Sequence, residues 1–150
     1  MRRKKTDRQK MKDKADTLAA WLCKRRDGYR CQKCGTQYQE GDRGIECSHI
    51  VPRGYMATRW HPLNLKTLCT RCHLYWWHSD PTESDLWANE FFGAERLAFL
   101  NSRRLSIGKY SVEDLRTIVQ RLQATKDAAE MTDIPILFPS PYPAEMEVAL

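Results

Sequence analysis

Four of the six cysteines form two pairs in which two residues separate the partners, Cys31 with Cys34 and Cys69 with Cys72. Two such pairs can supply the four thiolates of a tetrahedral, structural zinc site. A redox motif would explain one Cys-x-x-Cys pair but not both. The sequence therefore predicts that these four residues bind a structural Zn²⁺ ion, with a substructure inserted between the two pairs.

Two other uses of the cysteines conflict with the compartment that the sequence predicts. Residues 69–73 match the attachment motif of c-type haem, which requires export, and disulfides require an oxidising compartment. The basic N-terminus is followed by polar residues instead of the apolar stretch of a signal peptide, and no apolar run approaches the roughly 18 residues that span a bilayer. We therefore expect a cytoplasmic protein without a membrane segment. Cys23 and Cys47 are expected to be small buried hydrophobic residues.

The residues around and between the cysteine pairs resemble the HNH endonuclease family. Residues 26–35 resemble the entry to a zinc-stabilised HNH domain, residues 47–53 its first motif strand, Asn64 with Leu65 its central Asn element, and residues 68–73 the helix that closes the motif. These elements follow the family's order and spacing over about a third of the chain. Residues 47–49 and 57–60, together with Asn64, are closer still to phage HNH proteins of the NinG-like recombination type.

The resemblance implies a ββα-metal fold, in which a two-stranded ribbon packs on one helix with a cation between them. It implies that His49 is the general base that takes a proton from the attacking water, as a neutral imidazole can at pH 7. It also implies that Asn64 orients the loop of His49 through its amide. His73 would hold a divalent cation, Mg²⁺ or Mn²⁺, against the scissile phosphate. The predicted catalytic residues are therefore His49, Asn64 and His73.

Position 48 departs from the family pattern. HNH enzymes usually place Asp or His immediately before the general base, as a ligand of the cation, and this chain has Ser48. A neutral hydroxyl is a poor metal ligand, so Ser48 is expected to hold the cation loosely, with phosphate and water completing the shell. His78 could replace it, but residues five apart on an α-helix lie about 140° apart around the axis. His78 would share a face with His73 only where the helix breaks.

Basic side chains in the motif region are candidates for phosphate contacts, with ordinary surface charge as the alternative. They are Arg53, Arg59, Lys66 and Arg71. The aromatic residues could stack on bases, but in a chain with few aliphatic residues they are expected mainly to fill a core. They are Trp60, Tyr75, Trp76, Trp77 and Trp87. His61 precedes Pro62 and is expected to be exposed to solvent or to face DNA.

The positive charge is concentrated near the N-terminus. Residues 1–30 contain twelve Lys or Arg and four Asp, whereas the whole chain has a net charge of +6. A basic segment on a nearly neutral body favours a polyanionic partner, usually nucleic acid. A solvated charged helix is the alternative interpretation.

The chain is expected to be an α+β protein with four regions. Residues 1–27 form a basic helical arm, and residues 28–80 form the HNH domain with strands near 45–51 and 63–68. Residues 81–130 form a helical extension, with helices beginning at Pro81, at Ala94 and after Ser111. Residues 131–150 form a Pro-rich extended tail. Thr70 is expected to cap a helix that runs through residues 75–77.

These observations together predict a metal-dependent endonuclease that hydrolyses DNA phosphodiester bonds and is encoded by a phage or prophage. Two other functions stay open. One is an inert zinc-knuckle DNA-binding module that has lost the catalytic cation through Ser48, and the other is a recombination or packaging partner that binds proteins through its helical half. A single active site would nick duplex DNA, so double-strand cleavage would need a homodimer. No motif identifies the structure or sequence of the DNA substrate.

Overall fold

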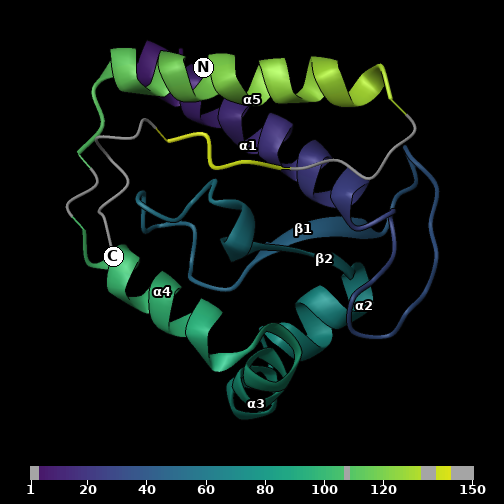
Figure 1. The fold of residues 1–150 in the computed structure, drawn as a ribbon. Helices are drawn as coiled ribbons and strands as arrows, with labels where there is room; N and C mark the ends of the chain where they lie inside the picture. Colours follow the sequence, from purple (N-terminus) through teal and green to yellow (C-terminus); the bar gives the residue numbers. More distant parts are fainter. Residues whose placement is uncertain (1–3, 107–108, 133–137, 143–150) are drawn as a thin grey trace.

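The computed structural model describes residues 4–106, 109–132 and 138–142 and has a mixed α+β fold, as the sequence predicts. Its longer helices are α1 (Asp7–Arg26), α3 (Pro81–Phe92), α4 (Ala94–Arg104) and α5 (Val112–Glu130). Figure 1 shows a two-stranded sheet between a layer of α1 with α5 and a second layer of α3 with α4. None of the described helices combines the length and the apolar character needed to cross a membrane.

The sheet consists of two antiparallel strands, β1 (Ile45–His49) and β2 (Leu65–Cys69). Ile45 lies opposite Cys69, and His49 lies opposite Leu65. Every residue of β2 is buried, because helices cover both faces of this small sheet. Three short elements adjoin β2: the 3₁₀ turn η1 (Pro62–Asn64) before it, and α2 (Thr70–Cys72) and the π-helical turn η2 (His73–Trp77) after it.

The helix starts that the sequence predicts at Pro81, Ala94 and Ser111 are confirmed. Ser111 forms a capping box in which its hydroxyl accepts from the backbone of Asp114 and the Asp114 carboxylate accepts from the backbone of Ser111. The expected cap at Thr70 is wrong by one residue. The cap of α2 is the preceding Cys69, whose sulfur accepts the N–H of Cys72.

α1 and α5 pack against each other and form most of the main hydrophobic core. Thr6 caps α1 by accepting the N–H of Gln9. The buried residues of α1 recur at helical spacing and meet those of α5; they are Ala15, Leu18, Ala19, Leu22 and Cys23, facing Leu115, Ile118, Val119 and Leu122. α1 therefore belongs to the central core in addition to presenting basic side chains.

The described part of the C-terminal segment, residues 138–142, also joins this core. Phe138 and Tyr142 are buried in it. The Tyr142 hydroxyl donates to the carbonyl of Met56 at 2.7 Å and accepts the N–H of Trp60 at 3.1 Å. This part of the tail therefore holds the loop between the two strands. Residues 133–137 and 143–150 of the expected tail lie outside the described residues.

Candidate metal centre and active site

The four predicted zinc ligands converge at one end of the sheet. Cys31 and Cys34 lie in the turns that follow α1, and Cys69 and Cys72 lie where β2 passes into α2. Their sulfur atoms all lie within 4.8 Å of one another, and those of Cys34 and Cys69 are 3.8 Å apart. Sulfurs bound to one tetrahedral zinc ion at 2.3 Å would be about 3.8 Å apart. The cluster can therefore hold a structural zinc ion.

The pKa values of the thiols in this cluster are shifted in different directions: burial raises the pKa of Cys31 and of Cys72, whereas that of Cys34 is lowered. Three of the cysteines are buried, and Cys34 is exposed. Burial raises the pKa of Cys34, but hydrogen bonds from Thr36 and from neighbouring thiols lower it more, to about 6. Gly35 adopts a positive φ of 75°, which lets its N–H fold back onto the carbonyl of Cys31 at 2.8 Å. Among the described residues, no other group of three or more His, Cys, Asp or Glu side chains converges in this way.

His49 ends β1 and presents a neutral imidazole. Its Nε2 lies 3.0 Å from the carbonyl oxygen of Arg59. Because a carbonyl oxygen can only accept, Nε2 carries the proton and Nδ1 keeps its lone pair. Burial lowers the pKa of His49 to about 4, and the hydrogen bond to Arg59 offsets only part of this effect. The ring is therefore uncharged at neutral pH, with its proton on Nε2 and with Nδ1 as its basic atom.

Asn64 is fully buried and joins η1 to the loop that follows His49. Its Oδ1 accepts the N–H of Val51 at 2.6 Å. Its Nδ2 donates to the carbonyls of Val51 and Thr58, at 2.9 and 3.0 Å. The amide thus fixes both ends of the segment that begins just after His49, which is the contact that the resemblance implies.

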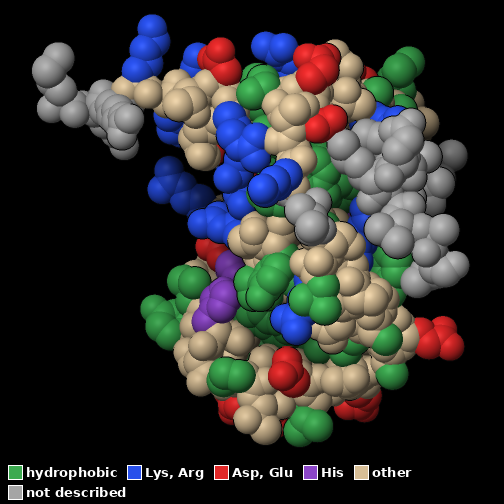
Figure 2. All heavy atoms as spheres, turned by 90° about the vertical axis from the view of Figure 1, so that its left-hand side faces the viewer, with side chains coloured by type: hydrophobic (Ala, Val, Ile, Leu, Met, Phe, Trp, Pro, Cys, Tyr) green, Lys and Arg blue, Asp and Glu red, His purple; other side chains and the backbone are tan. Residues whose placement is uncertain are grey.

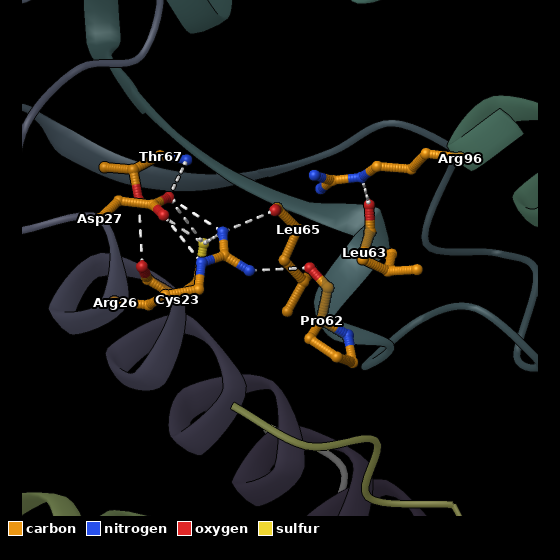
Figure 3. Close-up of polar contacts among 8 residues, drawn as sticks. All are labelled: Cys23, Arg26, Asp27, Pro62, Leu63, Leu65, Thr67 and Arg96. Atoms are coloured by element: carbon orange, nitrogen blue, oxygen red, sulfur yellow. Dashed lines mark hydrogen bonds and ion pairs between the residues drawn. The ribbon is translucent and has the colours of Figure 1, made fainter. Parts of the chain in front are cut away.

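The backbone beside this asparagine is held by two arginines (Figure 3). Arg26 of α1 donates to the carbonyls of Pro62 and Leu65, at 2.8 and 2.9 Å, and Arg96 of α4 donates to the carbonyl of Leu63 at 2.7 Å. Carbonyl groups on both sides of the buried amide therefore have a guanidinium donor. The ends of two helices fix the segment from which the amide projects.

Arg26 is held in turn by Asp27. Their side chains form an ion pair at 2.8 Å, and the second carboxylate oxygen of Asp27 accepts the N–H of Thr67 in β2 at 3.1 Å. The Asp27 side chain is nearly buried. Removing either partner would leave the other charge without compensation in a poorly solvated place.

His73 and His78 are neighbours because η2 is a π-helix. The N–H of His78 donates to the carbonyl of His73, five residues back, at 3.3 Å. The Nε2 atoms of the two rings lie 3.1 Å apart. The expectation that α-helical spacing would separate them by about 140° is wrong, because the wider π turn places residue i+5 above residue i.

Glu46 of β1 orients this pair. Its carboxylate accepts a hydrogen bond from Nδ1 of His73 at 2.5 Å, so the lone pair of a neutral His73 lies on Nε2 and faces His78. Burial and the neighbouring His73 lower the pKa of His78. Two imidazole nitrogens on one metal ion lie about 3.0–3.4 Å apart for metal–nitrogen bonds of 2.0–2.1 Å. The pair therefore fits a divalent cation, with Glu46 in the carboxylate–histidine–metal arrangement.

His49, His73 and His78 line one cavity of about 470 Å³. The exposed Arg53 also lines it. The remaining lining residues are Cys47, Ile50, Pro52 and Trp77. The structure therefore places an uncharged imidazole, a potential cation site and an exposed guanidinium around one cavity.

Ser48 does not line this cavity. It is fully buried, and its hydroxyl has no hydrogen-bond partner among the described residues. Ser48 is therefore not placed to bind a cation in this cavity, whereas His78 lies beside His73 there and Glu46 contacts His73. Alternation along β1 puts residues 46 and 48 on the same face of the strand, a signal that could have identified Glu46.

The four candidate phosphate-binding residues differ in accessibility. Arg53 and Arg71 are exposed. Arg59 forms a two-point ion pair with Asp16, at 2.6 and 2.8 Å, and also donates to the carbonyl of Arg53. Lys66 is fully buried. Neither Arg59 nor Lys66 is therefore available to a phosphate at the surface of this structure.

His61 and the aromatic residues serve mainly as packing groups. His61 is buried against Phe99 and Tyr142, so the expectation that it is exposed is wrong. Trp60 is fully buried in the main core. Trp76 and Trp77 pack beside the four-cysteine cluster, Trp87 packs edge to face on both of them, and Tyr75 is exposed.

In comparisons with protein-family models, with curated proteins and with solved structures, none matches this chain.

Proposed function

We propose that the protein is a metal-dependent endonuclease of the HNH family that hydrolyses DNA phosphodiester bonds. One observation supports this most directly: the neutral His49 and the pair formed by His73 and His78 line the same cavity. Phosphodiester hydrolysis needs a base for the attacking water and positive charge beside the phosphoryl oxygens. The cavity offers residues for both tasks.

In this mechanism Nδ1 of His49 accepts a proton from the attacking water. The carbonyl of Arg59 holds the opposite ring nitrogen, and Asn64 holds the loop that follows. His73 and His78 would hold a divalent cation, Mg²⁺ or Mn²⁺, and such a cation would supply positive charge beside the phosphoryl and leaving oxygens. Arg53, exposed at the cavity, contacts the phosphate backbone.

The distribution of charge supports a nucleic-acid partner. Figure 2 shows a face on which many Lys and Arg side chains gather above exposed histidine side chains. Twelve of the 25 Lys and Arg residues lie within residues 1–30. Arg2 and Arg3 lie outside the described residues, whereas Lys4 and Lys5 are exposed ahead of α1. Basic side chains next to a phosphodiesterase site would hold the backbone of DNA.

The direct test is nicking of supercoiled plasmid in Mg²⁺ or Mn²⁺, with chelator as the control. His49→Gln is the most informative variant, because its amide can still donate to the carbonyl of Arg59 but has no basic nitrogen. We expect cation-dependent nicking by the parent and a loss of about 10²–10⁴-fold in rate for His49→Gln. Equal nicking by parent and variant would refute the assignment of the base.

The second candidate function is a zinc-knuckle module that binds DNA without cutting it. It is favoured by the burial of Ser48 and by the four-cysteine cluster being the one converging group of three or more such ligands within the described residues. DNA binding by the zinc-loaded protein, without nicking at any concentration of Mg²⁺ or Mn²⁺, would establish this function and exclude the first.

A further inference from the structure

Lys66 occupies an unusual place for a lysine. It lies in β2 and is fully buried. Its Nζ donates to the backbone carbonyl of His49 at 2.9 Å and lies 3.2 Å from the centre of the Trp77 ring. The amine is thus in contact with two elements of the cavity at once.

These two contacts join the strand of the proposed base to the helix of the proposed cation site. Lys66 pairs with Ser48 across the sheet, so its side chain reaches one residue along β1 to the carbonyl of His49. Trp77 is the last residue of η2 and immediately precedes His78. A shift of either element would break one of the contacts of the amine.

Burying the Lys66 amine costs desolvation free energy, which indicates that the amine has a structural or functional role. Burial lowers the pKa of Lys66 well below its usual range, opposed by the nearby thiols of Cys47 and Cys23, while Arg96 adds to the lowering. Among the described residues, no carboxylate contributes to this shift in pKa. An apolar side chain of similar length would fill the space without the desolvation cost. The carbonyl and the ring are the groups that compensate it, whether the amine is charged or neutral.

We infer that Lys66 is a positioning residue, which fixes the His49 imidazole relative to the His73–His78 pair by bonding the end of β1 and packing on η2. The inference rests on the proposed function for its consequence in catalysis, but not for its consequence in structure. Without the amine, the carbonyl of His49 loses its donor from β2, and the two elements lose their shared contact.

The test compares Lys66→Met with Lys126→Met in the zinc-loaded full chain. Lys126 also lies on a tryptophan, 4.8 Å from the ring centre of Trp21, but it belongs to α5 and touches neither His49 nor the cavity. Nitrogen-15 spectra of the imidazoles report the tautomer of His49 without requiring activity. Plasmid nicking reports kcat and KM separately.

We expect the parent and Lys126→Met to show one tautomer of His49, protonated at Nε2, and Lys66→Met to show exchange between tautomers. Because a misplacement of about 1 Å can cost roughly a hundredfold in rate, kcat of Lys66→Met should fall between about tenfold and a hundredfold, with KM changed less than threefold. If Lys66→Met does not fold, Trp77→Leu removes the packing contact of the amine and should change the same spectra in the same direction.

Different results would refute the proposed function and the role of Lys66. If the parent does not nick DNA, the proposed function is wrong, and the imidazole spectra still decide the role of Lys66. If the folded Lys66→Met variant keeps the single tautomer of His49 and a kcat within twofold of the parent, the inference is overturned. The same spectrum in a folded Trp77→Leu variant would overturn it when the first variant cannot be studied.

Discussion

Replacing Asn64 with alanine should destabilise the protein severely, although it removes little hydrophobic surface. The side chain is fully buried and makes three hydrogen bonds to backbone groups, with distances between 2.6 and 3.0 Å. Asn64→Ala removes all three and leaves the N–H and carbonyl of Val51 and the carbonyl of Thr58 without this partner.

The magnitude follows from these three bonds. Each contributes a net of about 1 kcal/mol, and a buried group left without a partner costs about 1–3 kcal/mol. We therefore expect Asn64→Ala to lower the free energy of unfolding by about 3–5 kcal/mol. Asn64→Asp should also destabilise, because it keeps the acceptor for the N–H of Val51 but turns a carboxylate toward two carbonyls.

The assay is urea unfolding of the zinc-saturated protein at pH 7, followed by far-ultraviolet circular dichroism. Asn89→Ala is the matched control, because the Asn89 amide makes one exposed hydrogen bond, to the carbonyl of Asp85 at 2.9 Å. Its free energy of unfolding should change by less than about 0.5 kcal/mol. A change below 1 kcal/mol for Asn64→Ala would refute the claim that this amide holds the loop after His49.

Three further predictions concern the four-cysteine cluster, the buried imidazole and the C-terminal segment. The purified protein should contain about one tightly bound zinc ion per chain, and Cys31→Ser should largely unfold the protein, whereas Cys23→Ser should keep the zinc. Elemental analysis measures the zinc content and circular dichroism measures the folding. A Cys31→Ser variant that is stably folded without metal would contradict the prediction. The pKa of His49 is lowered to about 4, so below its usual pKa near 6.5 the unfolded chain binds a proton that the folded protein does not. The free energy of unfolding of the parent should therefore fall relative to that of His49→Gln as the pH falls from 6.5 to 4.5, by up to about 1.4 kcal/mol per pH unit. The same difference between the two proteins at both pH values would disprove this. Tyr142→Phe removes the bonds of its hydroxyl to Met56 and Trp60 and should cost about 1–3 kcal/mol by urea unfolding, with an unchanged midpoint as the contrary result.

Local signals in the sequence were sufficient for the helices and for the cysteine cluster. The Ser111 cap, Pro81 and the helical spacing of Leu18 and Leu22 depend on neighbours in the chain, so they predict helices directly. The two Cys-x-x-Cys pairs likewise predict one shared tetrahedral metal site, and the structure brings their four sulfur atoms together.

Other features depended on tertiary packing that spacing does not reveal. The π turn that joins His73 to His78 has no local sequence signature, and α-helical spacing predicted the wrong relation between the rings. Lys66 looked like a surface cation, because lysine is almost never fully buried. The burial of Phe138 and Tyr142 in the core was hidden by the prolines around them, which indicated only an extended chain.

The roles of His49 and of the His73–His78 pair can be separated by measuring the rate of plasmid nicking as a function of Mn²⁺ concentration, for the parent, His49→Gln and His78→Ala. If His49 is the base and His73 with His78 holds the cation, His49→Gln should lower the plateau rate by about 10²–10⁴-fold without moving the half-saturating concentration. His78→Ala should raise that concentration and regain rate as Mn²⁺ increases. Nicking that does not depend on the cation, or no nicking by the zinc-loaded parent at any Mn²⁺ concentration, would contradict the proposed mechanism.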